Sequence, residues 1–296
     1  MNTFVNKKEK FNLDLRFLVK LFGFLIPFIA TVMLYINGLL DLKNIKELGP
    51  DTVGGWNTTP ETWNAYSRDL GDFSFNFFSY FTIITNMFVM FWFLISMIGW
   101  KNEGLCNHNK KCYAISCRIL GFNSTTFVTT YITITMIIYM LMLLPLEPPV
   151  GAINWAGSMM HHLVTPIIMI IYYVCFYIKP KFLASKNIEV KSTKEFFKKD
   201  IFLVIIFPIL WGVIMMVRGE FRHYSQKPFQ YQYFFMYIRR SGADMPANLP
   251  GWAWFIIAFS AVVAIIVAGT AVYITLTNKG LKKYNKNPII TKQAKG

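Results

Sequence analysis

Six long apolar runs dominate this sequence of 296 residues. Each is close to the ~20 residues that a helix needs to cross the hydrocarbon core of a bilayer. Lipid offers no water to bond backbone polar groups, so such runs cross it as helices. The sequence therefore predicts an all-α, polytopic membrane protein, a bundle of about six transmembrane helices. The approximate spans are residues 17–40, 73–100, 119–144, 157–178, 201–217 and 253–277.

The basic residues indicate how this bundle is oriented. Of the 30 Lys and Arg residues, 22 lie in segments 1–20, 101–118, 179–199 and 278–296, which share one side of the membrane in a six-span arrangement. Cytoplasmic loops carry an excess of Lys and Arg. We therefore expect both the N-terminus and the C-terminus to be cytoplasmic. The predicted divisions are a cytoplasmic N-terminal segment (1–16), a transmembrane domain (17–277) and a basic cytoplasmic tail (278–296).

The net charge of +15 has two interpretations, nucleic acid or anionic lipid as the partner. The charges fall in short clusters between the apolar runs, which is the pattern of loops that determine membrane topology. No segment outside the spans is expected to fold into a basic surface that could bind nucleic acid. We therefore predict membrane lipids and no nucleic acid as partners, and the sequence identifies no protein partner.

Metal and cofactor sites are not expected. Three of the four cysteines (Cys106, Cys112 and Cys117) lie in one predicted cytoplasmic loop near His108, at a spacing that matches no zinc pattern, and Cys175 lies in a span. No Gly-rich phosphate loop precedes a Lys-Ser or Lys-Thr pair. The Lys- and Asn-rich composition favours a bacterium with a low-GC genome, and hence the plasma membrane.

Two histidines in the fourth span are the most informative polar residues, because ionisable side chains at membrane depth are costly and commonly functional. Asn154, Ser158, His161 and Thr165 follow helical spacing and predict one polar stripe, with His162 at its edge. The alternative is that the histidines are hydrated near the interface and that the hydroxyls only join helices.

The second span has a matching stripe, composed of Asn76, Ser79, Thr82 and Asn86. At 1.5 Å per residue, Thr82 and the histidines differ in depth by only ~6 Å. A hydroxyl held against an imidazole is the minimal pair for nucleophilic attack on an acyl carbon, with the histidine taking the threonine proton. We expect Thr82 with His161 or His162 to be catalytic, and Asn86 to orient groups or to stabilise an oxyanion.

Further pocket residues are predicted beside this pair. The candidates are Ser79, Asn86, Asn154, Ser158, Thr165 and Arg218. Arg218, at the outer end of the fifth span, could hold a carboxylate or phosphate headgroup or snorkel to water. In the third span, Asn123, Thr126, Thr130 and Thr133 also follow helical spacing, and we interpret them chiefly as hydrogen-bonding contacts between helices.

At these residues the sequence resembles the androgen-induced-gene family of membrane proteins, in particular its prokaryotic branch. The resemblance rests on the Phe-Thr-Ile-x-x-Asn run around Thr82, the histidine followed by Pro166, and the Arg218-Gly219 pair, and it covers about residues 73–277. It implies an intramembrane hydrolase of fatty-acid esters that uses a threonine and a histidine. The threonine is Thr82. Prokaryotic-like spacing favours His162, and animal-like spacing favours His161.

The leading hypothesis is a membrane-embedded hydrolase of lipid acyl esters, with a threonine nucleophile, a histidine base and no cofactor. An alternative is a non-enzymatic binder or transporter of a lipid or small apolar molecule. No Asp or Glu lies within any predicted span, which disfavours ion-coupled transport. A third hypothesis is a partner-binding membrane protein, suggested by the aromatic-rich outer segment 218–252.

Overall fold

A computed structural model describes residues 3–43, 70–98, 119–178, 193–225 and 230–285 of the protein. Within these ranges the chain forms helices and no strands, which confirms the predicted all-α class. Six helical stretches are long and apolar enough to cross a membrane, as the sequence predicted. They are Leu15–Leu40, Phe81–Ile98, Asn123–Leu146, Ala152–Tyr177, Ile201–Tyr224 and Gly251–Gly280.

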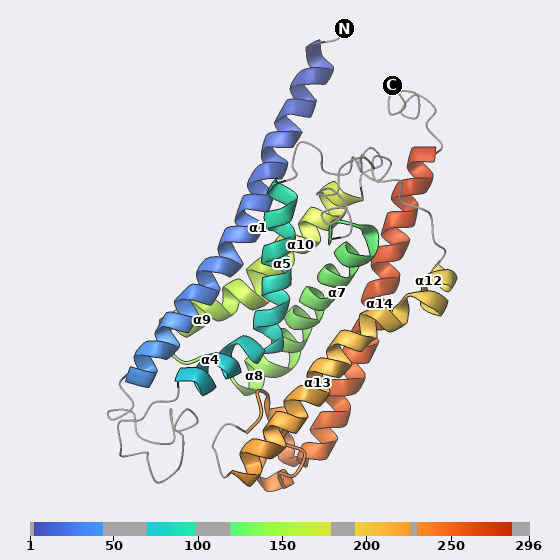
Figure 1. The fold of residues 1–296 in the computed structure, drawn as a ribbon. Helices are drawn as coiled ribbons and strands as arrows, with labels where there is room; N and C mark the ends of the chain where they lie inside the picture. The colour runs from blue at the N-terminus through green and yellow to red at the C-terminus, as the bar shows by residue number, and fades with distance from the viewer. Residues whose placement is uncertain (1–2, 44–69, 99–118, 179–192, 226–229, 286–296) are drawn as a thin grey trace.

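The six stretches form one bundle, seen from the side in Figure 1. The first and second stretches are α1 (Thr3–Lys43) and α5 (Phe81–Ile98), which pack against each other. The fifth and sixth are α13 (Ile201–Tyr224), preceded by the short α12 (Thr193–Lys199), and α14 (Gly251–Asn285). The start of α1 and the end of α14 lie at one end of the bundle. We call the opposite end, with residues 147–151 and 230–250, the distal end.

The third and fourth stretches are interrupted by π-helical turns. The third consists of α7 (Phe122–Ile138), the π turn η4 (Tyr139–Leu143) and α8 (Leu144–Leu146). The fourth consists of α9 (Ala152–Met159), the π turn η5 (Met160–Val164), α10 (Thr165–Tyr172) and the π turn η6 (Tyr173–Tyr177). A π turn adds a residue to the helical repeat and therefore rotates the side chains that follow it.

Two helix boundaries differ from the sequence prediction. The second span was expected to be continuous from residue 73, but the chain bends at Tyr80 between α4 (Leu70–Ser79) and α5. The fifth span was expected to end at residue 217, but α13 continues to Tyr224. Arg218 and Arg222 in this extension both pair with Asp72 of α4, whose carboxylate offsets part of their charge at the end of an apolar helix.

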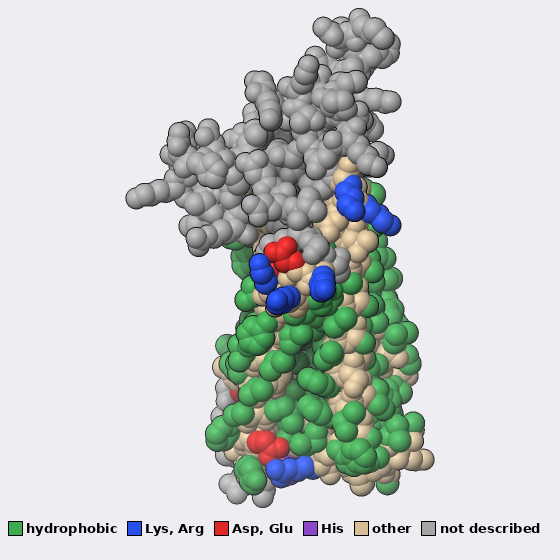
Figure 2. All heavy atoms as spheres, turned by 90° about the vertical axis from the view of Figure 1, so that its right-hand side faces the viewer, with side chains coloured by type: hydrophobic (Ala, Val, Ile, Leu, Met, Phe, Trp, Pro, Cys, Tyr) green, Lys and Arg blue, Asp and Glu red, His purple; other side chains and the backbone are tan. Residues whose placement is uncertain are grey.

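Burial divides the helices into central and lipid-facing ones. Of the most apolar 18 residues of each stretch, half or more are buried in α5 and in the third stretch, whereas only 11% are buried in α13. Apolar side chains cover the face formed by α13 and α14, as Figure 2 shows, and the charged side chains of α12 lie toward one end of it. An apolar band of this kind is the surface expected in contact with lipid tails.

A non-helical segment covers the distal end between α13 and α14. It contains three short 3₁₀ turns, η7 (Phe234–Met236), η8 (Gly242–Asp244) and η9 (Pro246–Asn248). Gly219 of α13 lets the segment approach closely, since a Cβ there would overlap the ring of Tyr231. The segment therefore packs into the bundle, and it brings Tyr233 to α5.

Candidate functional site

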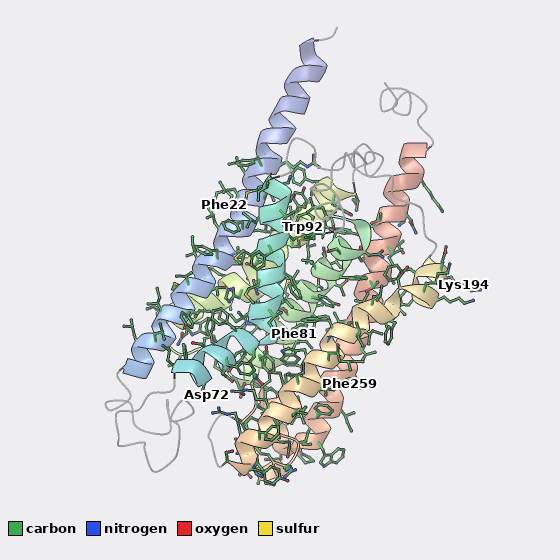
Figure 3. The ribbon with its side chains drawn as sticks, viewed as in Figure 1. Phe22, Asp72, Phe81, Trp92, Lys194 and Phe259 are labelled. Carbon is green, nitrogen blue, oxygen red and sulfur yellow. The ribbon has the colours of Figure 1, made fainter. Side chains whose placement is uncertain are left out.

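A cavity of about 350 Å³ lies between α5, α7, α13, α14 and the distal segment. Phe81, the first residue of α5, forms part of its wall and is labelled near the centre of Figure 3. Among the described residues that line it, only four carry a hydroxyl or imidazole group. The others are Gly212 and aliphatic or aromatic residues. These four are Thr82, Thr135, His162 and Tyr233.

The cavity reaches the outer face of the bundle between α13 and α14. Val213 and Val217 of α13 and Phe259 of α14 line it, yet each is about half exposed on the outer face of the bundle. Apolar side chains on both sides of the opening suit an acyl chain that moves in from the membrane. The cavity is therefore accessible from the apolar outer face of the bundle.

Thr82 occupies the start of α5, where the bend at Tyr80 interrupts the helix. The first N–H groups of a helix have no partner within it. The Thr82 amide points to the Tyr233 hydroxyl oxygen at a long 3.5 Å, and Thr82 Oγ1 lies 3.3 Å from the same oxygen. If the phenol oxygen accepts the amide proton, its own proton is available for Thr82 Oγ1. The Thr82 hydroxyl proton then remains available to a base.

Tyr233 is held in place by its ring and remains protonated. The ring stacks on Phe235 with centroids 5.2 Å apart and meets Tyr80 edge to face. Burial raises the pKa of Tyr233 to about 12. The hydroxyl is therefore a neutral hydrogen-bond donor throughout the physiological pH range. Sequence analysis noted only the aromatic-rich outer segment 218–252, which contains Tyr233, and assigned this residue no role in the site.

His162 faces the cavity that Thr82 also lines. Its ring lies flat on Tyr139, with centroids 3.7 Å apart and 10° between the planes. Ser158 donates a hydrogen bond of 2.8 Å to the Tyr139 hydroxyl and so fixes that ring. Nδ1 of His162 is buried and has no hydrogen-bond partner among the described residues. No hydrogen bond joins His162 to Thr82 in this structure, so the predicted pair shares a cavity without direct contact.

His161 faces the other way, toward α1. The Thr31 hydroxyl donates to the Pro27 carbonyl at 2.7 Å, so Nε2 of His161 is the donor in its 3.0 Å hydrogen bond to Thr31. This nitrogen also lies 3.4 Å from the Pro27 carbonyl. His161 is thus bound between the first and fourth stretches and does not line the cavity.

The π turn η5 divides the polar stripe that helical spacing predicted. Asn154 accepts a hydrogen bond from Asn37 of α1, and His161 also faces α1. Ser158 and His162, in contrast, face Tyr139 of the third stretch. Since both histidines belong to the π turn, their directions could not follow from a constant 3.6-residue repeat.

Asn86 and Ser79 do not line the cavity. Their hydrogen bonds instead hold neighbouring segments of the chain in place. The Asn86 amide donates to the carbonyl of Thr82 at 2.9 Å and to that of His161 at 3.2 Å, which ties α5 to the π turn. Ser79 accepts a 2.9 Å hydrogen bond from Gln232, and its carbonyl accepts one of 2.8 Å from Trp211. Ser79 therefore joins the distal segment and α13 to the start of α5.

Two further candidates lie outside the cavity. Arg218 is paired with Asp72 at 3.7 Å and lies over the ring of Phe75. Arg222 binds the same carboxylate through two 2.6 Å contacts. Thr165 is fully buried on α10, and its hydroxyl has no partner among the described residues.

Three cysteines and His108, which sequence analysis excluded as a zinc site, lie outside the described residues.

No protein-family model, curated protein or solved structure matches the chain. The assignment of this site therefore rests on its own geometry. Within the described residues, no group of His, Cys, Asp or Glu side chains is suited to hold a metal ion.

Proposed function

We propose that the protein is a membrane-embedded hydrolase that cleaves an acyl ester of a lipid, with Thr82 as the nucleophile and His162 as the base. One observation carries the proposal. A hydroxyl at a helix start and a buried imidazole line the same apolar cavity, which is open to the membrane. The sequence resemblance to intramembrane threonine hydrolases supports the same pair.

In this mechanism, Thr82 Oγ1 attacks the ester carbonyl carbon while His162 takes the hydroxyl proton. Collapse of the tetrahedral intermediate breaks the bond to the alkoxy oxygen, which receives the proton from His162. Water then hydrolyses the acyl-threonine and releases a fatty acid. Thr82 and His162 are not in hydrogen-bond contact, as is common for catalytic groups before substrate binds.

The negative charge of the tetrahedral intermediate needs donors that are already in place. The Tyr233 hydroxyl, 3.3 Å from the nucleophilic oxygen, is suited to this role. The start of α5 adds the positive end of an 18-residue helix dipole at the same position. The hydrogen bonds of Asn86 to the Thr82 and His161 carbonyls support a role in orienting the site.

Location follows from the same proposal. A hydrolase that takes substrate sideways from lipid requires a membrane, and we propose the bacterial plasma membrane with both termini in the cytoplasm. The 22 basic residues in the predicted cytoplasmic segments support this orientation.

A second candidate function is a non-enzymatic binder or transporter of a lipid or small apolar molecule. The specific observation in its favour is that the Thr82 hydroxyl contacts Tyr233 and neither histidine. In that case the polar groups would only orient a bound lipid.

The test is hydrolysis of p-nitrophenyl acyl esters, together with fluorophosphonate labelling, by detergent-purified protein. We expect Thr82→Ala and His162→Gln to abolish turnover, Thr82→Ser to retain part of it, and His161→Gln to retain most of it. Size-exclusion profiles control for folding. Full turnover by Thr82→Ala would refute the nucleophile. A folded wild-type protein that neither labels nor hydrolyses any ester, yet retains lipid, would support the binder.

A further inference from the structure

Three threonine hydroxyls in the interior of the bundle make no hydrogen bond among the described residues. They belong to Thr130 of α7, Thr165 of α10 and Thr270 of α14, all with no exposed surface. Helix α7, which carries Thr130, packs against both α10 and α14, which carry Thr165 and Thr270. The Cγ2 of Thr130 lies within van der Waals distance of a Cβ built on Gly269, the residue before Thr270.

These three are exceptions to the behaviour of threonine in this bundle. A threonine in a transmembrane helix ordinarily donates to the carbonyl four residues earlier. Thr129 and Thr133 of the same helix do so, each at 2.7 Å, and Thr277 of α14 does so at 2.9 Å. The unpaired hydroxyls are therefore a local feature that needs a physical reason.

Other hydroxyls on these helices pair with one another from helix to helix. Toward the chain termini, the Tyr173 hydroxyl lies 3.4 Å from that of Thr126 and 2.8 Å from that of Thr277. In the middle, the hydroxyls of Thr133 and Tyr273 are 2.7 Å apart. We call the whole set the hydroxyl column. Its members are Thr126, Thr130, Thr133, Thr135, Thr165, Tyr173, Thr270, Tyr273 and Thr277.

The hydroxyl column ends at the cavity. Thr130 precedes Ile134 by four residues on α7, Thr270 follows Ile266 by four residues on α14, and both isoleucines line the cavity. Thr165 follows His162 by three residues on the fourth stretch. The unpaired hydroxyls of Thr130 and Thr270 thus lie about one helical turn from residues of the cavity wall.

An unpaired hydroxyl in a low-dielectric interior loses its hydration without compensation, so native structures ordinarily satisfy such groups with an internal water. A buried water needs two to four polar partners, and the neighbouring paired hydroxyls can still accept hydrogen bonds. Ester hydrolysis consumes one water per turnover, whereas the lining of the cavity is mostly apolar. We propose that the hydroxyl column binds water and supplies it to the cavity.

The role of this water rests on the proposed hydrolase. After acyl transfer, water attacks the carbonyl carbon of the acyl-threonine and passes a proton to His162. The bond from that carbon to Thr82 Oγ1 breaks, the proton returns to Oγ1, and a carboxylic acid leaves. Acylation consumes no water, so the hydroxyl column affects the second step alone.

Thermal stability tests water binding without reference to activity. Thr130→Val and Thr270→Val each replace a hydroxyl by a methyl of the same shape. If the hydroxyls hold water, Tm stays equal or falls, because a satisfied hydrogen bond is lost. A rise in Tm for both variants would mean that the hydroxyls are dry and unpaired, and would overturn the proposal. Thr129→Val is the matched control, since it removes a hydroxyl bonded to a carbonyl on the same helix.

Pre-steady-state kinetics with a p-nitrophenyl acyl ester test the water supply. We expect Thr130→Val and Thr270→Val to keep the initial burst of p-nitrophenol and to slow the following steady state about tenfold, with acyl-protein visible by intact-mass spectrometry. Unchanged burst and steady state in both variants would refute the supply role. Absence of any ester hydrolysis by the wild type would count against the proposed hydrolase alone, because the stability comparison would still decide whether the hydroxyl column binds water.

Discussion

The hydroxyl oxygen of Tyr233 lies 3.3 Å from Oγ1 of Thr82, although 151 positions separate the two residues in the chain. This contact exists because α5 begins at Phe81 and because the distal segment packs into the bundle beside Gly219. It joins a helix of the interior to the segment that covers the cavity. The first prediction concerns this contact.

We expect Tyr233→Phe to remove the hydroxyl and keep the ring contacts with Phe235 and Tyr80. The loss of one hydrogen bond lowers the free energy of unfolding by about 1 kcal/mol. If the hydroxyl stabilises the oxyanion, kcat for ester hydrolysis falls about 10²- to 10³-fold. Because the pKa of Tyr233 is about 12, this contribution is constant below that pH and is lost only as the phenol ionises above it.

Tyr231→Phe is the matched control for this change. It removes a hydroxyl from the same segment, one that donates to Glu220 at 2.6 Å and does not reach Thr82. Ester hydrolysis and thermal unfolding are measured for both variants. Equal kcat in Tyr233→Phe and the wild type would exclude the oxyanion role and leave a purely structural contact.

Sequence reasoning could predict the parts of this fold that depend on local composition. The six spans follow from the number of consecutive apolar residues, because bilayer thickness sets helix length. The same reasoning predicted Thr82 with His161 or His162, since polar side chains at membrane depth are few, and the structure places Thr82 and His162 at one cavity. It ended the fifth span at residue 217, just before the charged residues Arg218 and Arg222, whereas the helix continues to Tyr224. Their partner, Asp72, is about 150 residues away in sequence.

The directions of the side chains could not be predicted in the same way. A helical repeat put His161 and Ser158 on one stripe, but the π turn η5 sends His161 to Thr31 and leaves His162 at the cavity. Nothing in the local sequence distinguishes a π turn from an α turn. The contact of Tyr233 with Thr82 was also beyond sequence reasoning, because it depends on how a non-helical segment folds back.

The second prediction concerns the carboxylate of Asp72 at the distal end, labelled in Figure 3. Asp72 lies between Arg218 and Arg222, and these three side chains are at most 15% exposed. Removing one member of a buried ion pair leaves an uncompensated charge, so we expect Asp72→Asn to lower the free energy of unfolding by about 3–5 kcal/mol. Thermal unfolding in detergent measures this loss.

Glu195→Gln provides the comparison for Asp72→Asn. Glu195 pairs with Lys199 on the exposed α12, where both side chains are 44% or more exposed. A surface pair one turn apart contributes about 0.3–0.5 kcal/mol. Similar small losses in the two variants would show that the Asp72 contacts contribute little to stability.

The last prediction concerns the opening of the cavity toward lipid. Gly212 of α13 lines the cavity, and a Cβ added there would meet nothing within 4 Å. Gly212→Leu would extend a branched side chain from this position, where the Cβ itself meets no neighbour. Replacing a helix-interior glycine also favours the helix by up to about 1 kcal/mol. We therefore expect Tm to be unchanged or higher, and hydrolysis of long-chain esters to fall at least about tenfold as the acyl chain is excluded.

Two comparisons make this last measurement specific. One uses esters of different acyl chain length, and the other uses a substitution on the exposed face of the same helix. Short p-nitrophenyl esters need less of the cavity, so Gly212→Leu should raise KM for a dodecanoyl ester much more than for an acetyl ester. Ile214→Phe enlarges a side chain on the same helix that is 56% exposed and does not line the cavity, and it should change neither value. Equal KM values for Gly212→Leu and the wild type with the long ester would place substrate binding outside this cavity. The binder hypothesis makes the corresponding prediction for lipid retention, since any occupant of the cavity meets the same leucine.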